Sequence, residues 1–239
     1  MLKKNYIFVH IPKSAGSTLK VSIKSIIEAD DIIWDYSHPF SQGRIVRNVK
    51  NTIESFSTKK YQRKVIFGHF MPCKYADLSF SGFNKRENSI YLTFLRDPLQ
   101  RAISHYYHWK REPDLTNSAC VTLLEEDWSL ERFLVDPFFK NFYAQFFFGF
   151  NINNFDFIGI TERFDESIAL LKMAYPEFSM LNVKENVNIN TQKVVDKAYV
   201  IDPDLALIFK KNNVLDYAIY EQALAVFNNK HSQLMMKNS

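Results

Sequence analysis

The feature that most limits how this chain can fold is the alternation of short apolar runs with longer amphipathic segments. Runs of strand length occur at residues 7–11, 65–67, 89–95 and 155–161. Between the first two runs, apolar residues recur at the spacing of one helix face, at Leu19, Ile23, Ile26 and Ile27. Strands that alternate with helices form parallel sheets covered on both faces. The sequence therefore predicts an α/β fold with a central parallel sheet flanked by helices.

Two later helices have recognisable N-termini. Asp97 and Pro98 follow the 89–95 run as an N-cap and a first helical residue. The helix they open has an apolar stripe made of Leu99, Ala102, Ile103 and Tyr106. Asp165 is expected to cap the helix that follows the 155–161 run.

The length and composition allow one sizeable core or at most two small ones. The chain has 239 residues, of which 46% are hydrophobic. We expect a single domain over residues 1–239, in which residues 202–227 are helical and 228–239 form a frayed tail. Cys73 and Cys120 match no metal-binding or disulfide framework, which predicts reduced thiols with a structural role.

The charge of the chain suits an anionic ligand. Its net charge of +4 is far too small to indicate nucleic acid, so we expect no nucleic-acid partner. Residues 35–64 are the least regular part of the sequence and carry seven basic residues against two acidic ones. Such a segment is either a solvated helix face or a basic surface beside the functional site.

The stretch HIPKSAGSTL, residues 10–19, joins the first strand to the first helix. Its backbone amides at the helix N-terminus favour an anion, and Gly16 lets the backbone come close to it. The order of residues differs from the ATP-binding loop GxxxxGK[ST], because Lys13 precedes the glycine. The other interpretation of this stretch is an ordinary capped turn with an exposed lysine.

A second anion-binding turn is predicted where the 89–95 strand ends. Arg96 stands at the carboxyl end of that strand, and Ser104 lies about two turns into the next helix. Ligands of α/β sheets bind at the carboxyl ends of the strands, where an arginine can hold a phosphate as a fork. A salt-bridged cap and a surface serine are the alternatives, but two such turns in one chain favour a phosphate-bearing ligand.

Together, HIPKSAGSTL and LRDPLQRAISHYY resemble the PAPS-dependent sulfotransferase superfamily, with its 5′-phosphosulfate loop and its 3′-phosphate motif. The HIPK form and the dipeptide Gly68-His69 most resemble the carbohydrate branch, which includes heparan-sulfate 2-O-sulfotransferases. The later stretch FDFIGITERFDESIALL also resembles a strand–turn–helix unit of that branch. The resemblance implies a three-layer P-loop-type domain that uses PAPS as the donor, without a metal.

The resemblance also implies a role for each matched residue. Lys13 would contact the oxygen that bridges sulfate and phosphate. Arg96 and Ser104 would bind the 3′-phosphate, and His69 would be the general base for the acceptor hydroxyl. The 5′-phosphate would be held by Ser14, Ala15, Gly16, Ser17 and Thr18. Ser14 and Ser17 stand where many members carry threonine, and both keep a hydroxyl.

Several alternatives stay open in the sequence. His38, His105 and His108 compete with His69 as the base, whereas His10 lies within the strand and is expected to be structural. His105 and His108 have no visible third metal ligand, so no metal site is predicted. A P-loop kinase-like enzyme using ATP and magnesium would need GK[ST], which is absent here. A non-catalytic nucleotide-binding protein would be expected to lose Lys13 or Arg96.

The acceptor is expected to be a hydroxyl of a carbohydrate or glycoconjugate. The basic segment 35–64 and a set of aromatic residues would suit a sugar chain that is already anionic; these are Tyr106, Tyr107, Trp109 and Phe146–Phe148. A polysaccharide, a glycolipid and a small metabolite all stay open, and so does the role of the asparagines at 182, 186 and 188. With no signal peptide of the usual form and no 18-residue apolar span, we expect a cytoplasmic protein, or a Golgi-luminal one only if the sequence is part of a longer chain.

Overall fold

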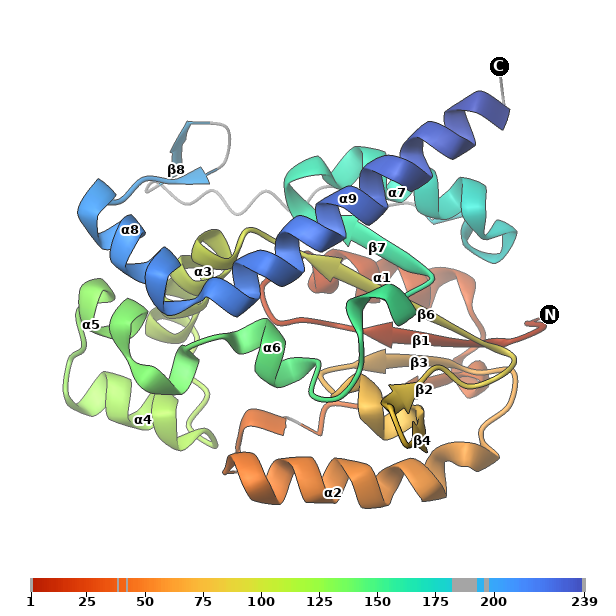
Figure 1. The fold of residues 1–239 in the computed structure, drawn as a ribbon, viewed down its shortest axis with the longest axis horizontal. Helices are drawn as coiled ribbons and strands as arrows, with labels where there is room; N and C mark the ends of the chain where they lie inside the picture. Colours follow the sequence, from red (N-terminus) through yellow and green to blue (C-terminus); the bar gives the residue numbers. More distant parts are fainter. Residues whose placement is uncertain (1, 38, 42, 182–192, 196–197, 238–239) are drawn as a thin grey trace.

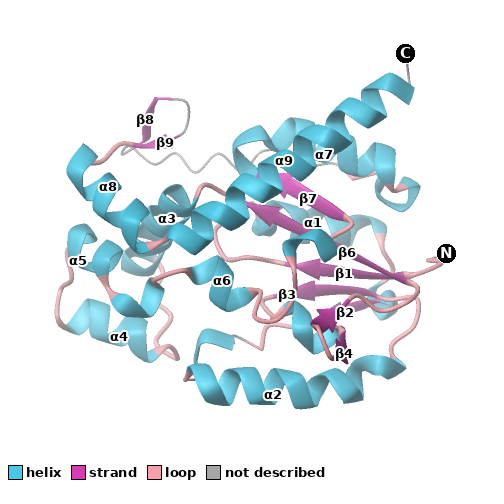
Figure 2. Ribbon diagram, viewed as in Figure 1, coloured by secondary structure: helices cyan, strands magenta, loops and turns pink. Residues whose placement is uncertain are grey.

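The structure is a computed structural model that describes residues 2–37, 39–41, 43–181, 193–195 and 198–237. At its centre is a five-stranded parallel sheet in the order β2-β3-β1-β6-β7, with helices on both faces (Figures 1 and 2). Its strands are β1 (Asn5–Val9), β2 (Ile32–Trp34), β3 (Val65–Gly68), β6 (Ser89–Leu95) and β7 (Phe157–Ile160). The predicted α/β fold is confirmed.

The central strands are buried because they consist almost entirely of β-branched, aromatic and leucine side chains. In β1, Phe8 lies between Phe67 of β3 and Leu92 of β6. The four apolar runs predicted as strands all form strands, with ends that differ by up to two residues. Strand β2 was not predicted from the sequence, because a run of three residues is too short to show a hydrophobic pattern.

Two helices follow the strands that matter for the site. α1 (Gly16–Ile26) buries Leu19 and Ile23 as predicted. α3 (Pro98–Arg111) begins as predicted, with the Asp97 carboxylate accepting a hydrogen bond of 3.0 Å from the Gln100 amide. α7 (Phe164–Ala174) instead begins before Asp165 and has Arg163 at its N-cap. The prediction that Asp165 caps this helix is therefore wrong.

Residues 35–64 are more regular than their sequence indicated, because they contain the fourteen-residue helix α2 (Arg44–Ser57). This helix lies along the lower edge of the molecule in Figure 1. Its polar residues Arg47, Asn51 and Ser55 are buried, and the Arg47 guanidinium carbon lies 4.2 Å from the centre of the Phe40 ring. A helix is therefore present, as in one of the two interpretations of this segment, but its regularity was hard to see in the sequence because its buried face is polar.

The C-terminal part forms α8 (Pro203–Asn212) and α9 (Val214–Lys237). The frayed tail expected from residue 228 is helical up to Lys237. Contacts with the body of the protein hold it, because Asn228 accepts a hydrogen bond of 2.6 Å from Arg163 and Lys230 donates to the Asp156 carbonyl. Before α8, β8 (Lys193–Val195) and β9 (Ala198–Tyr199) form an antiparallel pair.

Among the described residues, two hydrophobic clusters make up the core. One surrounds the sheet, and the other lies among α3, α8, α4 (Ser118–Glu125) and α5 (Leu130–Val135). In Figure 1 the arrowheads of the central strands point toward the second cluster. Cys73 belongs to the first cluster and Cys120 to the second, and both are free thiols, as predicted.

Candidate functional site

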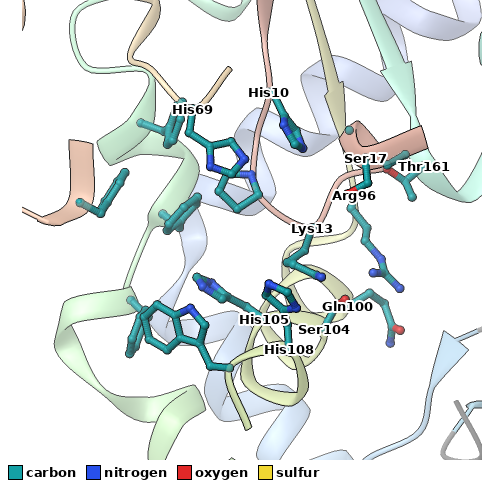
Figure 3. Close-up of a pocket in the computed structure, with 18 of the residues that line it drawn as sticks. His10, Lys13, Ser17, His69, Arg96, Gln100, Ser104, His105, His108 and Thr161 are labelled. Atoms are coloured by element: carbon teal, nitrogen blue, oxygen red, sulfur yellow. The ribbon is translucent and has the colours of Figure 1, made fainter. Parts of the chain in front are cut away.

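A cavity of about 840 Å³ lies at the carboxyl ends of the strands. Its lining includes residues that directly follow four strands: His10 after β1, His69 after β3, Arg96 after β6 and Thr161 after β7 (Figure 3). The strand order reverses between β1 and β6, and in α/β sheets this switch point opens the crevice in which ligands bind. The volume is within the range of small-molecule and cofactor sites.

The loop after β1 presents the start of α1 to this cavity. Lys13 and Ala15 have φ angles of 69° and 63°, in the left-handed region that side chains other than glycine rarely adopt. Ala15 is the N-cap of α1, and among the described residues no side chain caps that end. Because the first amides of a helix have no partner inside it, these N–H groups can bind an anion.

Gly16 is required by the close approach of His10. A Cβ atom on Gly16 would lie 1.7 Å from His10 Nε2, so only glycine lets the helix begin against this ring. Burial, then the nearby His69 and the charges of Lys20 and Lys13, lower the pKa of His10 well below its usual value. His10 is therefore a buried, neutral imidazole that supports the loop, in agreement with its expected structural role.

Gly68 has a similar role for His69. A Cβ atom on Gly68 would lie 1.8 Å from the Asp35 carbonyl oxygen, which explains why the strand ends in glycine. The ring of His69, which follows, lies 4.4 Å from the ring of His10 and 4.9 Å from that of Tyr36, measured between centroids. His69 therefore contacts two rings at the edge of the cavity, and Figure 3 shows it beside His10.

Lys13 supplies positive charge at the centre of a group of histidines (Figure 3). Its ammonium contributes to the lowered pKa values of His10, His105 and His108, although burial is the first cause for each. The cavity therefore combines a lysine with imidazoles that are kept neutral. A negative group bound there would meet the Lys13 ammonium, although Glu112, Asp114, Glu162 and Asp165 bring carboxylates to the same lining.

The backbone of Arg96 is held in place by a tyrosine hydroxyl. The Arg96 amide donates to the Tyr143 hydroxyl at 3.2 Å, and that hydroxyl donates to the Arg96 carbonyl at 2.6 Å. Tyr143 belongs to the short helix α6 (Phe142–Phe146) and is fully buried. The Arg96 side chain lies beside Glu162, at 3.9 Å from Nε to Oε1, and its guanidinium carbon is 5.8 Å from the centre of the Tyr199 ring.

The first turns of α3 complete this side of the cavity. Ser104 lines it, as does Gln100 one turn earlier. The side-chain amide of Gln100 donates to the Tyr199 carbonyl at 2.9 Å through Nε2, and it accepts from the Tyr199 N–H at 2.7 Å through Oε1. This pair of bonds brings the distant strand β9 to the cavity, so Tyr199 also lines it.

His105 is hydrogen-bonded to a buried arginine. Its Nδ1 lies 3.2 Å from Nη1 of the buried Arg101. Because a guanidinium can only donate, Nδ1 accepts and the proton of the neutral ring is on Nε2. Burial, then the Arg101 charge, lowers the pKa of His105 well below its usual value. His105 can therefore donate a hydrogen bond, but its basic nitrogen is occupied.

The structure brings most of the predicted site residues to one cavity, and these are Lys13, Ala15, Gly16, Ser17, Thr18, His69, Arg96 and Ser104. Ser14 is different, because its side chain is buried near Tyr143 and does not line this cavity. His38 and the asparagines at 182, 186 and 188 lie outside the described residues.

Sequence reasoning missed several residues of the site. Gln100, Glu162 and Tyr199 line it through contacts between distant segments, for which a single sequence carries no signal. Arg101 could have been found, since it precedes His105 by four residues on one helix face. In the part of the chain that the structure describes, no three His, Cys, Asp or Glu side chains are grouped as metal ligands. None of the described helices is long and apolar enough to cross a membrane.

The sequence matches no protein-family model and no curated protein. Among solved structures, the chain is similar to the crystal structure of the mouse sulfotransferase SULT7A1 complexed with PAP. The two chains are 14% identical, with 92% of this chain and 89% of the mouse chain covered, and the TM-score is 0.40. A TM-score this low does not indicate a shared function. We therefore infer the function from the cavity.

Proposed function

We propose that the protein is a PAPS-dependent sulfotransferase that moves the sulfuryl group to a hydroxyl of a carbohydrate or glycoconjugate. The observation that carries this proposal is the presence of two separate anion anchors in one cavity. Lys13 and the uncapped N-terminus of α1 form one, and Arg96 with Ser104 forms the other. Two anchors on different elements suit a ligand with a 5′-phosphate and a 3′-phosphate better than a single triphosphate chain.

The residues present fit such a donor. The amides from Ala15 to Thr18 and the hydroxyls of Ser17 and Thr18 would hold the 5′-phosphate. The guanidinium of Arg96, whose backbone is held by Tyr143, would bind the 3′-phosphate together with Ser104. When bound, the donor supplies an activated sulfuryl group and a bisphosphate leaving group.

His69 and Lys13 would carry the chemical step. His69 takes the proton of the acceptor hydroxyl while the acceptor oxygen forms its bond to sulfur. The bond between sulfur and the bridging oxygen breaks in the same step. Lys13 neutralises the negative charge that develops on that oxygen, which leaves as part of the 5′-phosphate of PAP. The remaining catalytic effect comes from holding donor and acceptor in line.

The surroundings of His10, His105 and His108 make each of them less suitable as the base than His69. The basic nitrogen of His105 already accepts from Arg101, and His10 is buried against Gly16. His108 lies farther along α3, where burial and then the Lys13 charge lower its pKa. His69 lies at the end of β3 beside the loop that carries Lys13, and this arrangement supports its assignment.

The wall of the cavity supports a carbohydrate acceptor. Trp109, Phe40 and Phe146 line it, and aromatic rings can pack against the apolar faces of sugar rings. His108 and Arg111 lie in the same lining, but both are beside Glu112, at 3.8 Å and 3.1 Å, so the support for a carbohydrate comes from the aromatic rings. Of the aromatic residues considered from the sequence, Tyr106, Tyr107, Phe147 and Phe148 do not line the cavity.

Ligand-induced thermal shifts test the donor. We expect PAP to raise the melting temperature in the presence of EDTA, because binding to the folded state alone stabilises it. ATP should raise it much less, since it has no 3′-phosphate for Arg96. A shift with ATP and magnesium that exceeds the shift with PAP would contradict the proposal and favour a kinase-like enzyme.

Transfer assays with ³⁵S-labelled PAPS, run across sulfated and unsulfated glycans, test the reaction. We expect Lys13→Ala and His69→Ala to lower transfer by roughly 10²–10⁴-fold, with PAP binding by the His69 variant unchanged. His231→Ala on α9 is the matched control and should keep full activity. Full activity of His69→Ala would remove it as the base. Tight PAP binding without transfer to any glycan would contradict the carbohydrate proposal.

A further inference from the structure

Helix α2 exposes a continuous stripe of large apolar side chains. The stripe consists of Ile45, Val46, Val49, Ile53 and Phe56, whose exposed fractions range from 54% to 80%. At 100° per residue these five positions fall within about a third of the helix circumference. An exposed apolar patch of this kind on a protein surface marks a contact with another molecule or a membrane.

The orientation of α2 is fixed by its polar face. Arg47, Asn51 and Ser55 point inward and are nearly fully buried. Nη2 of Arg47 donates to Gln145 Oε1 at 3.1 Å, and its guanidinium packs on Phe40. Rotating the helix to hide the stripe would bring these polar groups into water and break their contacts. The contacts of the polar face therefore keep the apolar stripe directed toward the surface in the folded protein.

Basic residues surround the stripe. Arg44 and Lys50 lie on α2, and Lys59 and Lys60 follow it in an exposed turn. Two acids lie near the stripe and both form ion pairs: Glu54 with Lys74 at 3.1 Å and with Lys50 at 4.0 Å, and Asp77 with Lys59 at 3.2 Å. The four basic residues outnumber the two acids, so the apolar stripe has an excess of positive charge near it.

We propose that α2 binds an anionic lipid bilayer and lies in the plane of its interface. An amphipathic helix with an apolar stripe and basic flanks is suited to this mode of binding. The stripe would enter the boundary between headgroups and acyl chains, and Arg44, Lys50 and Lys60 would reach lipid phosphates. The helix is about 21 Å long, so it lies on the membrane and does not span it.

A neighbouring hairpin also exposes two large apolar side chains. Strands β4 (Asp77–Ser79) and β5 (Gly82–Asn84) form this hairpin, which contains the exposed residues Leu78 and Phe80. It is joined to the C-terminal end of α2 by the Lys59–Asp77 pair and by a hydrogen bond from Arg86 to the Ser55 carbonyl.

A second copy of the chain is a less suitable occupant. In a two-fold pair each surface meets the same surface of its partner. Arg44, Lys50, Lys59 and Lys60 of one copy would then approach the same cations of the other, and like charges repel. Anionic headgroups instead complement these charges. Charge complementarity therefore favours a lipid surface over self-association.

Co-sedimentation with large unilamellar vesicles tests this proposal. We expect the full chain to bind vesicles of phosphatidylglycerol and phosphatidylcholine, and to bind pure phosphatidylcholine at least tenfold more weakly. Raising the salt concentration should weaken binding to the anionic vesicles. The variant Ile53→Gln/Phe56→Gln should bind at least tenfold more weakly, whereas Leu207→Gln/Ile208→Gln on α8, which also replaces two exposed apolar residues, should bind normally.

The outcomes are separable from misfolding and from the proposed enzyme activity. The substituted side chains are exposed, so the variants should keep the circular dichroism spectrum and melting temperature of the parent. Vesicle binding uses α2 and none of the cavity residues, so its result is independent of sulfate transfer. Equal vesicle binding by parent and Ile53→Gln/Phe56→Gln would overturn the proposal. So would absence of binding together with dimers, seen by analytical ultracentrifugation, that this variant abolishes.

Discussion

At the scale of single residues, the candidate site depends on contacts that leave no room for an additional methyl group. His10 occupies the space in which a Gly16 side chain would lie, and the Asp35 carbonyl occupies that of Gly68. Each glycine directly precedes or supports a residue of the proposed chemistry. Packing in the interior is therefore directly coupled to the shape of the cavity.

Substitution at Gly16 tests this coupling. We expect Gly16→Ala to lower the free energy of unfolding by about 1–3 kcal/mol, because the new methyl group displaces His10, and to weaken PAP binding. Gly43→Ala is the control, since a Cβ atom there would meet no described atom within 4 Å. Chemical denaturation and PAP titration check both effects, and equal stability of the two variants would contradict the assigned packing.

Arg96 allows a direct test of the 3′-phosphate assignment. We expect Arg96→Ala to weaken PAP binding on the order of tenfold to a hundredfold, which corresponds to the loss of a hydrogen-bonded charge pair. Binding of adenosine 5′-monophosphate, which lacks the 3′-phosphate, should change little. Isothermal titration calorimetry with both nucleotides measures the difference, and equal losses for the two would place Arg96 elsewhere on the ligand.

At the scale of secondary structure, apolar runs were sufficient to predict four strands of the sheet, because buried parallel strands are apolar throughout. The positions of Lys13, His69 and Arg96 at strand ends followed from them. The partners Tyr143, Gln100 and Tyr199 did not, because they reach the site through tertiary packing. Ser14 shows a further limit: a loop residue can face inward, and its sequence position does not reveal this.

The contact between α6 and the β6–α3 turn can be tested by removing one hydroxyl. We expect Tyr143→Phe to cost about 1–3 kcal/mol of stability, since the partly buried Arg96 backbone groups lose their partner. PAP affinity should fall as well, because Arg96 is less firmly held. Tyr107→Phe on α3, where the ring stacks on Tyr199, is the comparison. Unchanged PAP affinity in Tyr143→Phe would show that the clamp does not position Arg96.

The contact between α9 and α6 predicts a pH dependence of stability. Burial, only partly offset by the N–H groups of α6, raises the pKa of Asp216 to about 6. The folded state therefore binds this proton more tightly than the unfolded state, so the contribution of Asp216 to stability falls as the pH rises from about 4 to 6. Relative to Asp216→Asn, the parent should lose on the order of 2–3 kcal/mol over this range. Denaturation curves at several pH values measure this, and a constant difference would contradict the raised pKa.

At the scale of the whole molecule, the cavity lies where the sheet-centred core meets the cluster of α3, α4, α5 and α8. Lys13 lies in the loop between β1 and α1, which packs on the sheet-centred cluster. Ser104 lies on α3, which packs in the second cluster. A ligand held by both would connect the two clusters. The prediction of a single domain over residues 1–239 stays a prediction.

Hydrogen exchange can detect this connection. We expect saturating PAP to slow amide exchange in the first turn of α1 and in α3 together, because opening either would require the ligand to leave. Mass spectrometry of peptides from both segments, with and without PAP, measures the effect. Peptides from α2 serve as the control and should exchange at the same rate. Protection confined to α1 would mean that the second anchor is not used.

The left-handed backbone at Lys13 and Ala15 also has a consequence for protein engineering. Each residue holds a conformation that glycine adopts at about 1 kcal/mol less strain. A selection for heat resistance alone would therefore favour glycine at position 13 and remove the cation from the cavity. Thermostabilised libraries of this protein should be sorted for PAP binding before they are ranked by melting temperature, because the most durable sequences and the functional ones diverge at this loop.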